Sequence, residues 1–391
     1  MTVLLVHNHY RQPGGEDEVF AAEGGLLQTR GYRVVRYALH NDQTARQRPW
    51  TTAGAAIWNP AAYRAVRAVC RTERPRVAHF HNTFPLVSPA AWYAARAEGV
   101  PVVQTLHNYR LICPDALFFR HGDVCEECLC RFVPWPGIVH ACYHESRPAT
   151  GAVAAMLTIH RVLRTWTTVV DVYIALSDFA RQKFIQGGLP AAKIMVKPNF
   201  VHPDPGPGEG GGEYALFVGR LSTEKGTETL LAAWQQLRGK VPLRIVGDGP
   251  LAPRVAAVAQ EDNSVIWLGR QPKADVYALM KRARMLIVPS VCYENFPVVI
   301  AEAYAIGRPV LASARGSLAA LVDDGRTGLH IQPGDSQDLA AKAEWAWTHP
   351  LEMARMGREA RQEFERKYTA ERNYQMLSEI YSLVRRRTPK R

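Results

Sequence analysis

Glu294 and Glu302 stand eight residues apart, in a segment that reads Glu294-Asn-Phe-Pro-Val-Val-Ile-Ala-Glu302. Two carboxylates in one short segment can accept hydrogen bonds from several hydroxyl groups, which suits a sugar or a ribose. The helix expected at 297–306 would begin here with free backbone N–H groups, which favour an anion. The alternative is a solvated helix face, since any pair of glutamates can meet this spacing by chance.

A second segment supplies cations. It reads Gly219-Arg220-Leu-Ser-Thr-Glu-Lys225-Gly226 and follows a strand expected at 214–218. Arginine suits a bidentate contact with phosphate and lysine acts as a point charge, so one loop carrying both predicts a phosphate site. An ordinary surface turn is the alternative interpretation.

Two more glycine-containing turns follow expected strands. One is Val246-Gly247-Asp-Gly249-Pro, and the other is Trp267-Leu-Gly269-Arg. Glycine lets the backbone approach a ligand closely. A plain connection from a strand to a helix explains these turns equally well.

Strands and helices alternate along the chain and would position these motifs. The pattern predicts helices that include 16–29, 228–238 and 297–306. The strands are expected at 3–6, 32–37, 77–80, 102–106 and 172–176, then at 214–218, 243–246, 265–268, 285–288 and 309–312. Short apolar strands that end in polar loops are typical of parallel sheets with helices on both faces. We therefore expect an α/β protein with two doubly wound sheets and ligands at the carboxyl ends of the strands.

The Pro/Gly-rich segment 203–212 separates the two series of strands. We expect an N-terminal domain at 1–198, with a cysteine-rich insertion at about 113–148, and a second domain at 199–365. The residues 366–391 should form a C-terminal helix and a basic tail that pack back on the N-terminal domain.

Composition limits the class of protein. The chain has 391 residues, 47% of them hydrophobic, and a net charge of +12. Residues 1–198 carry +8, residues 199–384 carry −1, and the tail 385–391 carries +5. No apolar run is long enough for a membrane span and no signal peptide is evident, so a cytoplasmic protein is expected. The segregated charge indicates either a solvated surface or an anionic partner such as a membrane.

Cysteines gather in the expected insertion. Four of them could satisfy tetrahedral zinc, namely Cys113, Cys125, Cys128 and Cys142, with Cys130 nearby. His121, His140 and His144 are alternative ligands. Such a zinc would be structural, because it is remote in sequence from the loops described above. Free buried thiols or a disulfide are the alternatives.

Together these motifs resemble the retaining glycosyltransferases of family 4, whose GT-B fold has two facing Rossmann-like domains and a cleft between them. The most specific marks are the Glu294/Glu302 segment and the loop at 219–226. Weaker marks are Pro13-Gly14-Gly15-Glu16, His107-Asn108 and Gly247-Asp-Gly249.

The resemblance implies a role for each matched position. Arg220 and Lys225 match the pair that binds the donor diphosphate, Glu302 matches the acid that holds the ribose, and Glu294 lies near the donor sugar. His107 matches a histidine of the N-terminal domain near that sugar. The remaining donor-binding positions are Gly14, Gly15, Gly219, Gly247, Gly269, Asn295, Phe296, Pro297 and Val298. Proline has no N–H, so Pro297 removes one backbone donor.

The resulting expectation is a retaining, hexosyltransferase-type enzyme. It would move a sugar from a UDP-, GDP- or ADP-sugar to a glycan, lipid-linked or small-molecule acceptor in cell-envelope or exopolysaccharide biosynthesis, with no cofactor required. Contact with an anionic membrane, at its inner face, is a further expectation. The alternatives are a sugar epimerase or phosphorylase of the same fold, or a basic nucleic-acid-binding protein.

Overall fold

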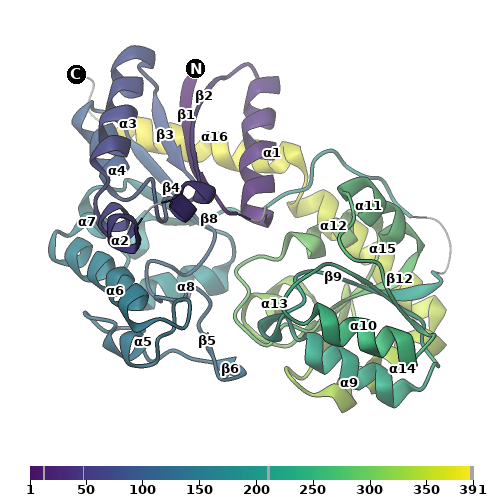
Figure 1. Ribbon diagram of the computed structural model, residues 1–391. Helices are drawn as coiled ribbons and strands as arrows, with labels where there is room; N and C mark the ends of the chain where they lie inside the picture. Colours follow the sequence, from purple (N-terminus) through teal and green to yellow (C-terminus); the bar gives the residue numbers. More distant parts are fainter. Residues whose placement is uncertain (12–13, 47, 209–211, 388–391) are drawn as a thin grey trace. The chain divides into compact units, whose positions relative to one another are not determined.

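The computed structural model describes residues 1–11, 14–46, 48–208 and 212–387. The chain forms two compact units (Figure 1). Unit 1 comprises Met1–Phe118, Cys125–Pro198 and the described residues from Asn373 onward, and unit 2 comprises Phe119–Val124 and Asn199–Arg372. Both units are therefore built from separate stretches of the chain.

Unit 1 is built on a six-stranded parallel sheet in the order β2-β1-β3-β4-β7-β8. The strands are β1 (Thr2–His9), β2 (Arg33–His40), β3 (Val77–Phe80), β4 (Val102–Leu106), β7 (Val172–Ala175) and β8 (Ile194–Val196). Every residue of β3, β4 and β7 is buried, as expected for strands covered on both faces.

Helices of unit 1 connect and cover these strands (Figure 1). They are α1 (Gly15–Thr29), α2 (Pro49–Ile57), α3 (Pro60–Glu73), α4 (Ala90–Ala97), α5 (Trp135–Val139), α6 (Arg147–Val162), α7 (Thr165–Thr168), α8 (Asp178–Gln186) and α16 (Ala370–Arg387). Helix α16 comes last in the chain but packs into the core of unit 1, where Leu377, Ile380 and Tyr381 lie against Val3 and Val103.

Unit 2 has a six-stranded parallel sheet in the order β11-β10-β9-β12-β13-β14. The strands are β9 (Tyr214–Val218), β10 (Leu243–Val246), β11 (Val265–Trp267), β12 (Ala283–Val288), β13 (Val310–Ser313) and β14 (Gly328–Ile331). In sequence order this is 3-2-1-4-5-6, the arrangement of dinucleotide-binding sheets. The predicted α/β class with two doubly wound parallel sheets is confirmed.

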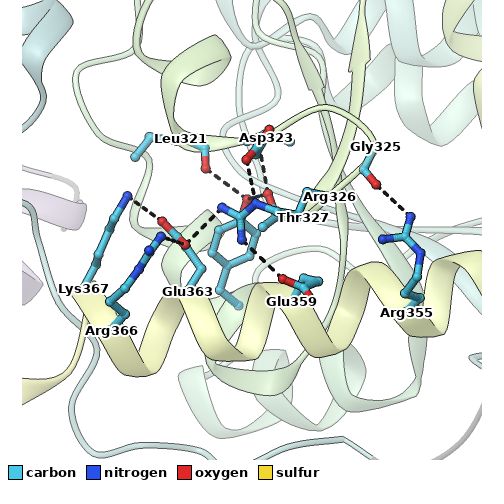
Figure 2. A network of polar contacts seen from close by, with 12 residues as sticks. Leu321, Asp323, Gly325, Arg326, Thr327, Arg355, Glu359, Glu363, Arg366 and Lys367 are labelled. Atoms are coloured by element: carbon cyan, nitrogen blue, oxygen red, sulfur yellow. Dashed lines mark hydrogen bonds and ion pairs between the residues drawn. The ribbon is translucent and has the colours of Figure 1, made fainter.

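The helices of unit 2 are α9 (Thr227–Leu237), α10 (Ala252–Glu261), α11 (Lys273–Arg282), α12 (Val298–Ile306), α13 (Gly316–Leu321), α14 (Ser336–Thr348) and α15 (Pro350–Lys367). Figure 2 shows how α15 holds the loop that precedes β14. Arg326 of that loop pairs with Asp323 at 2.6 Å and with Glu363 of α15 at 3.1 Å. Glu363 is buried and also pairs with Lys367 at 2.5 Å.

Two parts of the sequence differ in detail from the expectation. Much of the Pro/Gly-rich segment is attached to unit 2, because Asp204 pairs with Arg361 at 2.7 Å and the Gly208 N–H donates to the Ile306 carbonyl. Strands β8 and β14 were not predicted, since β8 has only three residues and β14 contains a glycine and a histidine. Pro13 and the tail residues Lys390 and Arg391 lie outside the described residues.

Candidate functional site

The order of strands in unit 2 places two of the predicted loops beside each other. Strand β9 is at the centre of the sheet and pairs with β10 on one side and β12 on the other. The connections that leave β9 and β12 run to opposite sides of the sheet, which opens a crevice at their carboxyl ends. The loop at 219–226 follows β9, and the loop that carries Glu294 follows β12.

Lys225 and Glu294 meet in this crevice. The Lys225 Nζ lies 2.5 Å from the Glu294 Oε1, and the Ser290 hydroxyl donates to the same oxygen at 2.7 Å. Burial lowers the pKa of Lys225, but the Glu294 carboxylate outweighs it and raises the pKa above its ordinary value. Lys225 is therefore a fixed positive charge at neutral pH, and 30% of its side chain remains exposed for a ligand.

Glu302 lies on α12, directly after the Glu294 loop. Its side chain is buried and forms an ion pair with Lys273, the first residue of α11. The same helix is anchored two residues later, because the Tyr304 hydroxyl donates to the Leu321 carbonyl at 3.0 Å. Glu302 is thus a carboxylate held in one place by a partly exposed lysine.

The three glycine turns are joined to one another. The Gly219 N–H donates to the Val246 carbonyl, and the Gly247 N–H donates to the Gly269 carbonyl at 2.8 Å. Gly247 has φ of +141°, and a Cβ on it would lie 1.8 Å from the Gly219 carbonyl oxygen. Trp267 reinforces this contact by donating from its indole Nε1 to the Gly247 carbonyl at 3.0 Å.

The other predicted residues of unit 2 lie around this edge. Arg220 is exposed and has no ion pair with any described residue. Asn295 and Phe296 are buried in the loop before α12, Pro297 caps that helix and Val298 is its first residue. Unit 2 therefore brings together Gly219, Arg220, Lys225, Gly247, Gly269, Glu294 and Glu302 along one edge of its sheet, whereas Gly14, Gly15 and His107 belong to unit 1.

The glycines of unit 1 lie at the start of α1, and their role in donor binding stays a prediction. Gly14 is extended, with φ of −132°, and its N–H donates to the Asp17 carboxylate at 2.8 Å. Neither Gly14 nor Gly15 has the positive φ that only glycine adopts readily. Asp17 is the organising residue here, because its Oδ1 also lies 2.9 Å from the His7 Nε2 and 2.8 Å from the His9 Nδ1.

A second carboxyl of α1 lies next to the predicted histidine segment. The Asn108 amide donates to Glu16 Oε1 at 2.9 Å and to the Tyr10 hydroxyl at 3.1 Å. Burial raises the pKa of the Glu16 carboxyl to about 7. The carboxyl therefore changes its charge near neutral pH, which is common at functional sites.

The variant Glu16→Gln tests how much the ionised Glu16 carboxylate destabilises the folded protein. Because the folded-state pKa lies above the ordinary value, the native state holds a proton that the unfolded state releases, so stability falls as the pH rises from about 4.5 to about 7. We expect the variant to exceed the parent in unfolding free energy by about 3 kcal/mol at pH 8 and nearly to match it at pH 4.5. Urea unfolding at both pH values measures this. The exposed Glu18, changed to Gln, is the control, and an equal difference at both pH values would contradict the prediction.

His107 follows β4 and is 9% exposed. Its Nε2 lies 3.0 Å from the Nδ1 of His81, which follows β3. Burial lowers the pKa of both rings well below the ordinary value. His107 is therefore a neutral side chain at physiological pH.

The structure describes the cysteines of the insertion as free thiols. Cys113 and Cys128 are buried, and burial raises the pKa of Cys128 to about 12, which keeps that thiol protonated. Among the described residues, no three cysteine sulfurs lie within 4.8 Å of one another. Four thiolates bound to one zinc would be about 3.8 Å apart. Zinc binding stays a prediction, because Cys113, Cys125 and Cys142 all lie near enough to Cys128 to affect the pKa of its thiol.

Two family models match the chain, one in each of its two series of strands. Residues 13–205 match the model described as Glycosyltransferase Family 4, and residues 212–349 match the model described as Glycosyl transferases group 1. The chain belongs to the family 4 glycosyltransferases. A glycogen synthase of Mycobacterium tuberculosis is 28% identical to this glycosyltransferase over 357 residues, or 85% of this chain and 76% of that protein. A D-rhamnosyltransferase of Pseudomonas aeruginosa is 31% identical over 164 residues, or 41% and 42% of the two chains.

Solved structures agree on the fold. HepE of Anabaena, in a crystal structure with UDP, has a TM-score of 0.69 and 19% identity, and the match covers 98% of this glycosyltransferase and 100% of HepE. Sucrose-phosphate synthase of Thermosynechococcus elongatus has a TM-score of 0.70 and 17% identity, with 98% of both chains covered. The predicted GT-B fold is thereby confirmed, as is the prediction that the protein is a glycosyltransferase.

Several site residues were not predicted from the sequence. Lys273, Ser290 and Asp17 contact predicted positions but belong to no motif recognised there. Glu16 ends the segment Pro13-Gly14-Gly15-Glu16, but no role was predicted for it. Glu16 and Asp17 had one usable signal, since acidic residues in the first turn of a helix commonly cap it.

Proposed function

We propose that this glycosyltransferase transfers a hexosyl group, with retention of anomeric configuration, from a nucleoside diphosphate sugar to a glycan or lipid-linked acceptor. The proposal rests on the Lys225–Glu294 pair in the crevice of unit 2. The loop that carries Glu294 leads directly into α12, which carries Glu302. This arrangement offers a fixed cation for a diphosphate and carboxylates for hydroxyl groups.

The chemistry would depend on where charge develops. Cleavage of the bond between sugar and diphosphate leaves negative charge on the diphosphate and makes the sugar resemble an oxocarbenium ion. Lys225 is already held in place by Glu294, so little reorganisation is needed to stabilise that charge, and Arg220 supplies a second cation from the same loop. Glu302 would accept hydrogen bonds from the ribose hydroxyl groups. The ribose would then replace Lys273 as the partner of this carboxylate.

Incubation with UDP-, GDP- and ADP-sugars tests the donor, with release of the nucleoside diphosphate as the readout. HepE has been crystallised with UDP-glucose, which makes UDP-glucose the first donor to assay. Proton NMR of the first product formed reports its anomeric configuration. An inverted product would overturn retention, and the absence of turnover or binding with all three donor classes would overturn the proposed reaction.

An exposed apolar surface on unit 1 supports a lipid-linked acceptor, presented at the inner face of a membrane. Phe132, Trp135, Val162 and Leu163 are 58%, 52%, 63% and 54% exposed. They lie near one another, because Arg161 of α6 donates to the Phe132 carbonyl at 2.8 Å and α5 packs on α6 (Figure 1). Aromatic residues among cations suit a membrane interface with anionic lipid. Among the described residues, no helix has the length and apolar character needed to cross a membrane.

Replacing the apolar side chains of this surface should weaken membrane binding. We expect the double variant Phe132→Ser/Trp135→Ser to reduce flotation with vesicles of one-third anionic lipid at least fivefold, because buried aromatic area is lost. Leu351→Ser in unit 2, at a side chain that is 83% exposed, is the matched control. Equal flotation of the two variants would show that this surface does not contact lipid.

A further inference from the structure

Two histidines of β1 and one aspartate of α1 direct their polar atoms at a single point. His7 and His9 are two residues apart on the strand, so their side chains lie on the same face of the sheet. The Asp17 Oδ1 lies 2.9 Å from the His7 Nε2 and 2.8 Å from the His9 Nδ1. One ligand atom from each of the three residues falls within 4.8 Å of the others.

The three side chains are held in this arrangement by their neighbours. The His7 ring stacks on Phe20 with ring centroids 4.6 Å apart, and the two histidine rings are nearly perpendicular to each other. The Gly14 N–H donates to the other Asp17 oxygen, Oδ2, at 2.8 Å. That bond fixes the carboxylate and leaves Oδ1 directed at the histidines, as outer partners of a metal ligand commonly do.

The charge of Asp17 is balanced differently from that of the buried glutamates. Glu23, Glu302 and Glu363 each form an ion pair with a lysine. The Asp17 side chain is only 10% exposed, yet among the side chains that the structure describes it has no lysine or arginine partner. Aspartate is ionised at neutral pH and most histidines are then neutral. The partial positive charge at the start of α1 helps, but a full positive charge would fit between these residues.

The spacing of the ligand atoms suits a small metal ion. Zinc binds histidine nitrogen and carboxylate oxygen at about 2.0–2.2 Å, which places the ligands of a tetrahedral ion about 3.3 Å apart. The two contacts to Asp17 are slightly shorter than this, so a movement of a few tenths of an ångström would admit the ion. The His9 side chain is 33% exposed and provides a path of entry.

We propose that His7, His9 and Asp17 form a binding site for one divalent first-row metal ion of the zinc type. Two imidazoles beside one carboxylate favour such ions over magnesium, which prefers oxygen ligands. Three protein ligands leave at least one coordination position for water. The ion would join the end of β1 to the first turn of α1. The proposal does not depend on the reaction proposed above.

Calorimetric titration with zinc chloride tests the site. We expect the parent protein to bind one more zinc ion per chain than His9→Ala, or to bind it at least about tenfold more tightly. Taking this difference excludes zinc bound by the cysteines of the insertion. Asp17→Asn keeps the shape of the side chain and removes its charge, and should cause the same loss. Equal binding by the parent and a folded His9→Ala, with circular dichroism as the check of folding, would overturn the proposal.

His40→Ala is the matched control. His40 pairs with His9 in the register of β1 and β2 and stacks on its ring with centroids 5.9 Å apart, but its Nδ1 lies 3.0 Å from the Asp42 Oδ2. We expect His40→Ala to bind zinc within threefold of the parent. A loss as large as that of His9→Ala would show that the three-residue ligand set is wrong.

Nitrogen-15 NMR of the unsubstituted protein gives a test that needs no folded variant for its main result. Saturating zinc should shift the ring nitrogen signals of His7 and His9, whereas the same concentration of magnesium should leave them unchanged. Comparison with His9→Ala assigns the His9 signals. If no histidine signal of the parent shifted at saturating zinc, the proposal would be wrong.

Discussion

Lys225→Met is expected to lower kcat for sugar transfer by a factor of about 100 to 1000. The lysine is the cation held at the crevice of unit 2, and methionine keeps the apolar stem while it removes the charge. Loss of one preorganised electrostatic contact to a developing charge costs about 3–4 kcal/mol of transition-state stabilisation. Steady-state turnover with a saturating donor, beside a binding measurement for the nucleoside diphosphate, gives the size of the effect.

Lys240→Met is the matched control for this variant. Lys240 also pairs with a glutamate, Glu344, at 2.6 Å, but it lies on the exposed surface of unit 2 with 60% of its side chain accessible. Surface ion pairs of this kind contribute little, about 0–1 kcal/mol. Turnover of Lys225→Met within threefold of that of Lys240→Met would remove Lys225 from the diphosphate site. Arg220→Met should show a smaller loss than Lys225→Met, because no residue described here holds Arg220 in position.

Gly247→Ala is expected to destabilise unit 2 by at least 3 kcal/mol and to abolish donor binding. The new methyl carbon would lie 1.8 Å from the Gly219 carbonyl oxygen, which is backbone and cannot rotate away. Relief would require the turns after β9 and β10 to separate, and these are two of the three turns that hydrogen bonds join at this edge. Thermal unfolding monitored with and without UDP would show a lower midpoint and no stabilisation by the nucleotide.

Gly239→Ala separates the steric effect from backbone strain. Gly239 also has a positive φ, +82°, but a Cβ there would meet no atom within 4 Å. Left-handed backbone costs an alanine about 1 kcal/mol, so this control should remain folded and bind UDP. If both variants lost the same amount of stability, the contact with the Gly219 carbonyl would not be the cause.

The predictable part of the site lies in unit 2. Arg220, Lys225 and Glu294 belong to loops that follow apolar strands, and strand order alone brings two such loops together. Glycine at 247 has a direct physical reason, since its φ and the nearby carbonyl exclude other residues. The distance of 2.5 Å between Lys225 and Glu294 was not predictable, because it depends on the order β9-β12 and not on sequence spacing.

The buried polar contacts of unit 1 were harder to predict, because they join residues that are far apart in the sequence and form no short motif. Glu23 falls in the apolar stripe of α1, three residues after Phe20 and four before Leu27. A carboxyl at such a position signals a buried partner, but the partner Lys197 is far along the chain and follows an unpredicted strand. The spacing of the cysteines predicted that Cys113, Cys125 and Cys142 would lie around Cys128, and all three affect the pKa of its thiol.

The place of α16 in unit 1 has a consequence for synthesis. Its Tyr381 hydroxyl bonds His79, and its apolar face completes the core around Val3, although more than 370 residues separate the two along the chain. A ribosome therefore releases β1 long before the helix that covers it exists. Unit 2 contains the uninterrupted stretch Asn199–Arg372 and can assemble earlier. During translation the core of unit 1 therefore cannot be completed until α16 has been synthesised. The hydrogen bond between His79 and Tyr381 cannot form before then.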